Sequence, residues 1–227
     1  MSKNAERLAA LAVHVGRCNA VADIGTDHGW LPIRLYREGL CRKLILTDIG
    51  EGPLARARAN VEAVFGEIPS AFSLRQGDGL VPLAKGEADV CVIAGMGGET
   101  IAAMMDAAGE KARSIRKYVL QPRSKSDRLR QFLCDNGYRI ADEDLVPERG
   151  RICEIILAAP LPLQAADSSE KTQPAQPSQE ELLRAKNHPL LEEFLENKAR
   201  IAAQIATARN RPLVQVPRAR ADCHIKE

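Results

Sequence analysis

The turn after the first apolar run constrains the fold of this chain more than any other segment. Residues 20–22 are small and apolar, and they lead into Asp23 and a short polar stretch that holds Gly25 and Gly29. Apolar residues then recur from Trp30 at a helical spacing. A buried strand, a glycine turn and a helix start bring backbone N–H groups and the positive end of a helix dipole to one point. The segment therefore predicts a site for a nucleotide-type ligand.

The turn departs from the dinucleotide-binding fingerprint. That fingerprint reads G-x-G-x-x-G, whereas this chain reads G-T-D-H-G and carries Asp27 where the middle glycine would lie. A carboxylate is a poor neighbour for a pyrophosphate, because both are anionic. It suits a ligand that brings an amino group or a sulfonium, so the turn favours a ligand with positive charge.

The rest of the first 159 residues alternates between strand and helix patterns. Further strands are expected at residues 43–47, 71–75, 88–94 and 118–120, and helices at 2–15, 51–65, 100–108 and 126–136. Residues 138–146 and 152–158 are close enough to form an antiparallel hairpin. This alternation predicts an α/β fold with a doubly wound, mostly parallel, seven-stranded Rossmann-like sheet.

Polar residues and glycines fall at the predicted carboxyl ends of these strands, where open α/β sheets bind ligands. They are Asp23, Asp48, Asp78, Gly95 and Gln121. Asp48 can accept hydrogen bonds from two ribose hydroxyls, or it can cap the next helix. Asp78 lies between two glycines and either meets the amine of an adenine or belongs to a plain turn. Residues 95–98 read G-M-G-G, which favours a close approach of the backbone to a ligand over a simple sharp turn.

Composition excludes several other classes of protein. No segment approaches the roughly 18 consecutive apolar residues that cross a membrane, and the polar N-terminus predicts no secretory signal. Six cysteines, at positions 18, 41, 91, 134, 153 and 223, form no C-x-x-C motif. They are expected to be reduced core thiols of a cytoplasmic protein. The four histidines have no metal-ligand spacing, so no metal is expected.

The C-terminal third has a different organisation. Residues 160–179 are rich in Pro, Ser, Gln and Ala, which is typical of a linker. Residues 180–210 then predict a small helical domain, with a short helix at 180–186 and an amphipathic helix whose apolar stripe runs from Leu190 to Ala208. The tail at 211–227 has no clear pattern.

Basic residues gather in two stretches. Between residues 111 and 130 there are eight basic residues and one acid, and between residues 209 and 220 there are four arginines and no acid. Such runs are often solvated helix faces, but the first one brackets the fifth strand beside the proposed site. The expected phosphate contacts are Arg123, Lys125, Arg128, Arg209 and Arg211. The scarcity of aromatic residues counts against stacking of bases along a single strand.

Five motifs together resemble one known family. They are V-A-D-I-G-T-D-H-G-W-L-P-I, L-T-D-I-G-E-G-P-L, Q-G-D-G-L, I-A-G-M-G-G and V-L-Q-P. The chain resembles the bacterial tRNA (adenine-22-N1)-methyltransferases, which are class I enzymes that use S-adenosylmethionine, over residues 7–157 and more faintly over 187–208. The resemblance implies a methyltransferase sheet, a C-terminal coiled-coil-like helical domain, S-adenosylmethionine as cofactor and tRNA as partner.

The resemblance also implies roles for individual residues. The methionine half of the cofactor would be held by Asp23, Gly25, Asp27 and Gly29. Its ribose and adenine would be held by Asp48, Ile49, Asp78 and Gly79, and the floor under the methyl group would be formed by Gly95, Met96 and Gly97. N1 of adenine has an in-plane lone pair, so no general base is required. Asp27 and Gln121 are the candidate catalytic residues, because either could accept a hydrogen bond from N6.

Three alternatives remain at this stage: a class I methyltransferase for a small molecule or protein, a nucleotide-dependent oxidoreductase, and a non-catalytic RNA-binding protein with this fold. Asp27 and the paired glycines at 97–98 count against the oxidoreductase. A monomer without membrane contact is the expected state.

Overall fold

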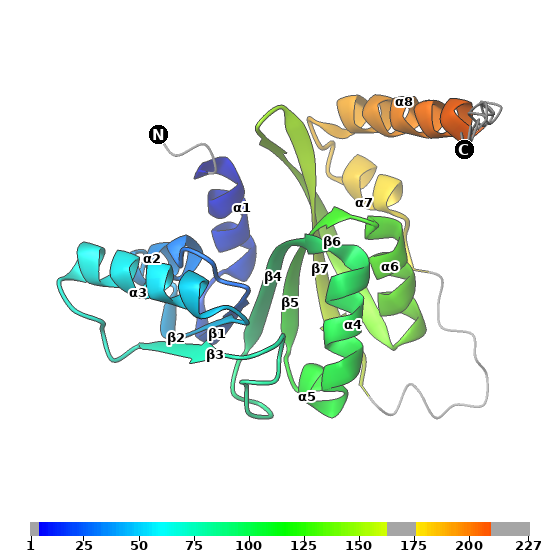
Figure 1. The fold of residues 1–227 in the computed structure, drawn as a ribbon. Coiled ribbons are helices and arrows are strands. Elements are labelled where there is room, and N and C mark those ends of the chain that lie inside the picture. The colour runs from blue at the N-terminus through cyan, green and yellow to red at the C-terminus, as the bar shows by residue number, and fades with distance from the viewer. Residues whose placement is uncertain (1–4, 163–175, 210–227) are drawn as a thin grey trace, which may run out of the picture. The chain divides into compact units, whose positions relative to one another are not determined.

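The structure, a computed structural model, describes residues 5–162 and 176–209. Its centre is a seven-stranded sheet in the order β3-β2-β1-β4-β5-β7-β6 (Figure 1). The strands are β1 (Cys18–Ile24), β2 (Cys41–Asp48), β3 (Phe72–Gln76), β4 (Val90–Gly97), β5 (Lys117–Ser124), β6 (Tyr138–Glu148) and β7 (Arg151–Pro160). The first five are parallel, and β7 is antiparallel to both β5 and β6. The predicted fold class is confirmed.

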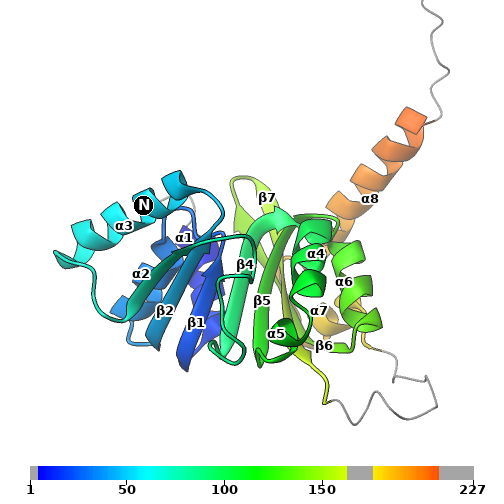
Figure 2. The ribbon, with the colours of Figure 1, turned by 60° about the horizontal axis from the view of Figure 1, so that its bottom comes forward.

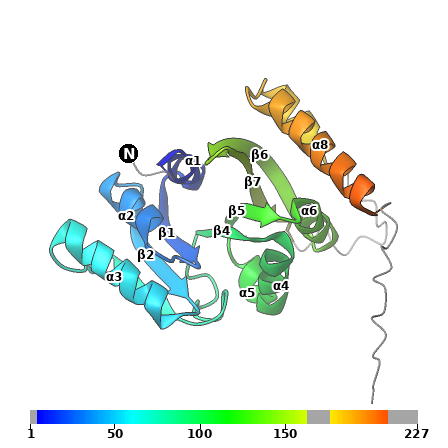
Figure 3. The same cartoon turned by 45° about the horizontal axis from the view of Figure 1, so that its top comes forward.

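Helices cover both faces of this sheet. One face is covered by α1 (Ala5–Val15), α2 (Trp30–Arg37) and α3 (Glu51–Phe65), and the other by α4 (Gly98–Ala108), α5 (Glu110–Arg113) and α6 (Ser126–Asp135) (Figures 2 and 3). Successive strand residues point to opposite faces, so Val21 belongs to the core under α1–α3 while Ala22 belongs to the core under α4–α6. This double burial explains why the central strands read as continuous apolar runs rather than as alternations.

Two strands extend further than the sequence predicts. β4 continues through the glycine segment to Gly97, and β5 continues to Ser124. Their register shifts at Met96, which is typical of a bulge. The Gln121 side chain accepts a hydrogen bond from the backbone N–H of Gly95 at 3.0 Å and so replaces a ladder bond at the irregular point. The short α5 was not predicted.

The C-terminal helices divide between two compact units. The first unit ends at Leu191 and therefore includes α7 (Gln179–Ala185), whereas α8 (Leu191–Arg209) lies almost wholly in the second. α7 starts with a capping box between Ser178 and Glu181, and Gln179 donates a hydrogen bond to Glu154 of β7 at 2.8 Å. The short helix thus packs with the sheet, which differs from the domain boundary expected at residue 180. Most of the expected linker, at residues 163–175, and the tail at 211–227 lie outside the described residues.

The close packing of α4 against the end of β5 generates a first prediction. A Cβ atom at Gly98 would lie 2.3 Å from the backbone oxygen of Lys125 and 3.0 Å from that of Ser124. Backbone atoms cannot move aside cheaply, so Gly98→Ala should lower the free energy of unfolding by about 1–3 kcal/mol. The measurement is urea denaturation.

A second helical glycine provides the matched control. At Gly52, in the first turn of α3, the nearest atom to an added Cβ is Nη1 of Arg56 at 3.7 Å. Gly52→Ala should therefore raise the free energy of unfolding by roughly 0.5–1 kcal/mol. Equal effects of the two substitutions would contradict this account of the α4–β5 contact.

Candidate active site

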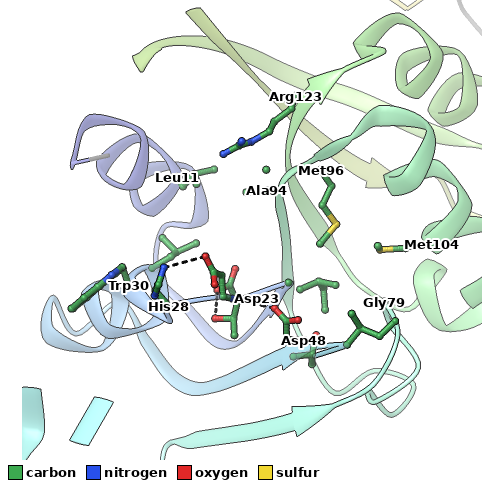
Figure 4. A pocket seen from close by; sticks show the side chains of 18 of the residues that line it. Leu11, Asp23, His28, Trp30, Asp48, Gly79, Ala94, Met96, Met104 and Arg123 are labelled. Atoms are coloured by element: carbon green, nitrogen blue, oxygen red, sulfur yellow. Dashed lines mark hydrogen bonds and ion pairs between the residues drawn. The ribbon is translucent and has the colours of Figure 1, made fainter. Parts of the chain in front are cut away.

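A cavity of about 320 Å³ opens at the carboxyl ends of β1, β2 and β4 (Figure 4). The expected cofactor residues that line it are Asp23, Gly25, Asp27, Asp48, Ile49, Asp78, Gly79, Gly95 and Met96. Its volume is in the range of small-molecule sites. The strand ends that the sequence singled out therefore do converge on one cavity.

The glycine turn after β1 adopts the left-handed backbone conformation at three positions. The φ angles are +69° at Gly25, +50° at Asp27 and +69° at Gly29. A Cβ atom at Gly25 would lie 2.2 Å from Cε of Met96, so that flexible side chain would have to move, and the left-handed φ itself favours glycine at this point of the cavity wall. Asp27 takes a conformation that glycine prefers, which agrees with its place at the middle glycine of the fingerprint. The backbone N–H groups of Gly25 and Thr26 both donate to the carbonyl oxygen of Thr47 at 2.9 Å.

Two glycines expected to contact a cofactor lie outside the cavity lining. Gly29 precedes α2, and a Cβ atom there would lie 3.2 Å from Cβ of Ala57 and 3.3 Å from Cδ2 of Leu46. Gly97 precedes α4, and a Cβ atom there would lie 3.5 Å from the hydroxyl of Ser124. Neither glycine lines the cavity. At Gly29 the missing side chain lets α2 start close to Ala57 and Leu46, whereas a Cβ atom at Gly97 would make only an ordinary contact.

Asp23 is the most buried acid of the cavity. The residue is 7% exposed, and the Thr26 hydroxyl donates a hydrogen bond to its carboxylate at 2.7 Å. Burial raises the pKa of Asp23 to about 6, although the Thr26 bond and the charge of Arg7 act in the opposite direction. The charge of a buried carboxylate that accepts a hydrogen bond from only one neutral donor is incompletely stabilised. A cation bound in the cavity would stabilise the Asp23 carboxylate further.

Asp48 and Asp27 are held by defined contacts at the same edge. One carboxylate oxygen of Asp48 accepts from the backbone N–H of Gly50 at 3.0 Å, and the other accepts from the N–H of Asp27 at 3.2 Å. The exposed Asp27 carboxylate forms an ion pair with Arg56 at 2.7 Å, and Nε2 of His28 lies 3.3 Å from its other oxygen. Both acids are therefore oriented before any ligand binds.

Several cavity residues were not found by the sequence reasoning. Arg7 comes from α1, where the helical spacing predicted packing on the sheet but gave no sign of a cavity. Its guanidinium donates to Glu148 at 2.6 Å and to Gln121 at 3.4 Å. Trp30 and Met104 also line the cavity, and Arg123 lies there rather than at a separate surface. Figure 4 shows Arg123 on the opposite side of the cavity from Asp48.

Gln121 lies behind the cavity wall rather than in it. Its side chain is fully buried, and its carboxamide oxygen accepts from Gly95 at 3.0 Å while its nitrogen donates to the carbonyl of Pro122 at 3.2 Å. Gln121 is absent from the cavity lining. In this arrangement its carboxamide holds the backbone of β4 at Gly95 and does not reach the cavity lining, where the sequence reasoning expected it.

The first basic stretch does not form a single surface, because β5 divides it. Lys111 and Arg113 precede the strand and donate to backbone carbonyls. Arg130, in α6, forms a largely buried ion cluster with Glu143 and Glu154.

Three basic residues of this stretch remain available for a ligand. Arg123, Lys125 and Arg128 follow the core of β5 and are exposed, and the described part of the chain offers them no ion pair. They are the three residues of this stretch among the five that the sequence assigned to phosphate contact. The side chain of Arg209, and Arg211 as a whole, lie outside the described residues.

Within residues 5–162 and 176–209, no group of three or more His, Cys, Asp or Glu side chains could hold a metal ion. No helix among these residues is long and apolar enough to cross a membrane.

Comparisons with known proteins agree with this geometry. A family model described as a methyltransferase domain matches residues 4–156. The chain is 35% identical to the tRNA (adenine(22)-N(1))-methyltransferase of Bacillus subtilis over 156 residues, which are 69% of this chain and 65% of that protein. It thus spans 60% to 65% of the length of the curated relatives that it matches.

Solved structures with the same fold cover more of the chain. The crystal structure of the Bacillus subtilis m1A22 tRNA methyltransferase has a TM-score of 0.69 at 29% identity, over 90% of this chain and 88% of that one. A Streptococcus pneumoniae protein in complex with S-adenosyl-L-methionine has a TM-score of 0.74 at 27% identity, over 89% of both chains.

The raised pKa of Asp23 generates a prediction about stability. Below the pKa of the unfolded chain, near 3.9, Asp23 is protonated in both states and has no effect. As the pH rises from about 3.9 to 6, the unfolded chain ionises Asp23 while the native state keeps the proton, so stability falls, and above pH 6 the full cost of about 2–3 kcal/mol remains. Asp23→Asn removes this cost, so the variant should be more stable than the parent at pH 8 and equally stable near pH 4. Thermal melts across this pH range measure the difference.

The exposed Asp106 of α4 provides a control for loss of a surface carboxylate, and Asp106→Asn should leave the melting temperature nearly unchanged at both pH values. A variant at Asp23 that is less stable than the parent at pH 8 would mean that its charge is compensated in the native state.

Proposed function

The chain belongs to the methyltransferase domain family, whose model matches residues 4–156, and we propose that it transfers a methyl group from S-adenosylmethionine to N1 of adenine 22 in tRNA. The observation that carries the proposal is the buried carboxyl of Asp23 beside the glycine turn, in a cavity that Asp48 and Asp78 also line. S-adenosylmethionine has a cationic sulfonium and a cationic α-amino group, so an acid-lined cavity suits it. The named relatives support the choice of RNA and base.

The cavity residues fit the parts of this cofactor. Asp23 would hold the α-amino group and Arg7 the carboxylate, because these pairs have opposite charges. Asp48 would accept hydrogen bonds from the ribose hydroxyls. The hydroxyl of Thr47 supports a polar ligand independently, because it is buried in a residue that lines the cavity and has no partner among the described residues.

The other half of the cofactor meets a less polar part of the cavity. Ile49 would flank the adenine, and Asp78 with Gly79 would meet its polar edge. Gly95 and Met96 would form the floor under the methyl group, where the left-handed Gly25 makes room for the Met96 side chain. Gly29 acts one step back, since its missing side chain lets α2 start close to Ala57 and Leu46. Gly97 would continue the floor after Met96.

The chemistry requires little of the side chains. When bound, S-adenosylmethionine supplies an electrophilic methyl group on its sulfonium. N1 of neutral adenine has an in-plane lone pair, so no side chain has to remove a proton from it. The protein has to hold N1 in line with the S–CH₃ bond and keep water out.

Asp27 is the catalytic residue that we assign. Its carboxylate lies at the edge of the cavity, where it would accept a hydrogen bond from N6 of the target adenine and stabilise the cationic product. Arg56 and His28 orient it. Gln121 assists indirectly, because it fixes Gly95.

The target adenine has to leave its stack to reach the cavity, at a cost of a few kcal/mol. Trp30 lines the cavity and is 45% exposed. An exposed aromatic ring at a binding site offers a stacking partner for a base, worth roughly 1–3 kcal/mol. We assign Trp30 to reception of the flipped base.

Phosphate contacts would come from the edge of the cavity. Arg123 lines the cavity, and Lys125 and Arg128 follow it in the chain. Arg209 and Arg211 would add a second contact from the C-terminal part. A tRNA substrate implies a cytoplasmic protein, and a monomer would suffice for the reaction.

The proposed reaction is tested by its product. The full chain, incubated with unmodified tRNA and methyl-labelled S-adenosylmethionine, should place label in 1-methyladenosine at position 22, and a tRNA with guanosine there should receive none. Nucleoside analysis by mass spectrometry identifies the base. Label in another nucleoside would overturn the base assignment. Cofactor binding without any RNA methylation would favour a small-molecule or protein substrate, or a non-catalytic RNA-binding role.

The ribose contact is tested by Asp48→Ala. The substitution removes one or two hydrogen bonds to a charged acceptor, each worth roughly 1.5–3 kcal/mol, so S-adenosylmethionine should bind at least tenfold more weakly in calorimetry. Asp106→Ala, an exposed acid of α4 away from the cavity lining, is the control and should bind normally. Unchanged affinity of the Asp48 variant would exclude the ribose role.

The phosphate contacts are tested by replacing Arg123, Lys125 and Arg128 together with alanine. If all three meet phosphates, the slope of log affinity for tRNA against log salt should flatten by up to about 2–3, taking the value for duplex DNA as a guide. Binding of tRNA is measured across a salt series.

A triple variant of Arg17, Arg37 and Arg42 is the matched control. These exposed arginines lie at the opposite, amino-terminal edge of the sheet, so their loss removes the same charge without touching the proposed interface. Equal slopes for the two triple variants would mean that the change in salt dependence comes from net charge alone. That result would contradict the proposed contact surface.

A further inference from the structure

Two cysteines that are far apart in the sequence meet at the amino-terminal edge of the sheet. Cys18 and Cys41 are the first residues of β1 and β2, and they are partners in the parallel register of these strands. Their Sγ atoms are 3.0 Å apart. The other cysteines of the described residues are Cys91, Cys134 and Cys153, and the structure places none of them at such a distance from another thiol.

The two thiols have different surroundings. Cys18 is partly exposed, whereas Cys41 is buried. The hydrogen bond between them lowers the pKa of Cys18, as do the charges of Lys117 and Arg116, while burial and the charge of Asp89 oppose this effect. The same bond and burial raise the pKa of Cys41. The proton shared by the pair therefore stays on Cys41, and Cys18 is the thiol that ionises and that solvent reaches.

We propose that Cys18 and Cys41 are an oxidisable dithiol pair that a hydroperoxide converts into a disulfide between β1 and β2. The Cys18 thiolate attacks the peroxide, so that an S–O bond forms, the O–O bond breaks and the leaving oxygen takes up a proton. The Cys41 sulfur then attacks the Cys18 sulfur, the S–O bond breaks, and hydroxide leaves with the Cys41 proton as water. Both sulfurs are oxidised by one electron each, and the peroxide is reduced by two.

The backbone permits this bond. Neighbouring strands lie about 4.8 Å apart, within the range of roughly 4.4–6.8 Å that disulfides span between Cα atoms. The sulfurs have to approach by only about 1 Å to reach a bond length near 2.05 Å. The closed ring would contain β1, the glycine turn and α2. The pair lies at the opposite edge of the sheet from the cavity, so the proposal is independent of the proposed function.

Peptide mapping of the full chain tests the proposal. After treatment with hydrogen peroxide and digestion with trypsin without reduction, Cys18 and Cys41 should appear in one linked species made of residues 18–34 and 38–42. Dithiothreitol should separate the two peptides. Because the ring constrains the unfolded chain, oxidation should also raise the melting temperature by about 5 °C.

Two variants separate this pair from general thiol oxidation. Cys18→Ser should form no linked species and show no rise in melting temperature, while Cys134→Ser, which removes a partly exposed thiol without a thiol neighbour, should behave as the parent. Oxidation of Cys18 to sulfinic acid while Cys41 remains free to alkylate would overturn the proposal. A link from Cys18 to a different cysteine would overturn it as well.

Discussion

The site depends on two hydrogen bonds that join the glycine turn to the end of the neighbouring strand. The N–H groups of Gly25 and Thr26 both donate to the carbonyl of Thr47. This connection continues the parallel pairing of β1 and β2 into the turn, and that pairing places Asp23 and Asp48 at one edge of the cavity. The two bonds also fix the turn relative to Asp48, whose carboxylate accepts a hydrogen bond from the N–H of Asp27. Backbone geometry thus places the acidic side chains at the cavity, and the cofactor proposal rests on that placement.

Much of this arrangement could be predicted because local patterns in the sequence encode it. Apolar runs that are buried on both faces identify the central strands, and glycines and acids at their ends identify the edge at which a ligand binds. The departure at Asp27 was informative as well, since its left-handed backbone keeps the geometry of the fingerprint while its side chain changes the charge.

The remaining features arise from contacts between distant segments, which no local pattern encodes. Arg7 reaches the cavity through its bond to Glu148, 141 positions later. Gln121 lies inside β5 rather than at its end, and its side chain accepts a hydrogen bond from Gly95 beside the irregular point of β4 instead of lining the cavity. The contact between Cys18 and Cys41 likewise depends on the register of two strands.

The central claim is that the acidic edge of β1 and β2 holds a cationic amino-acid moiety joined to a nucleoside. A crystal structure with S-adenosylhomocysteine, the demethylated product form of the cofactor, tests it most directly. The account predicts the ammonium group within hydrogen-bond distance of Asp23 and the ribose hydroxyls on Asp48. A ligand bound with its nucleoside against Asp23, or outside this cavity, would contradict the account.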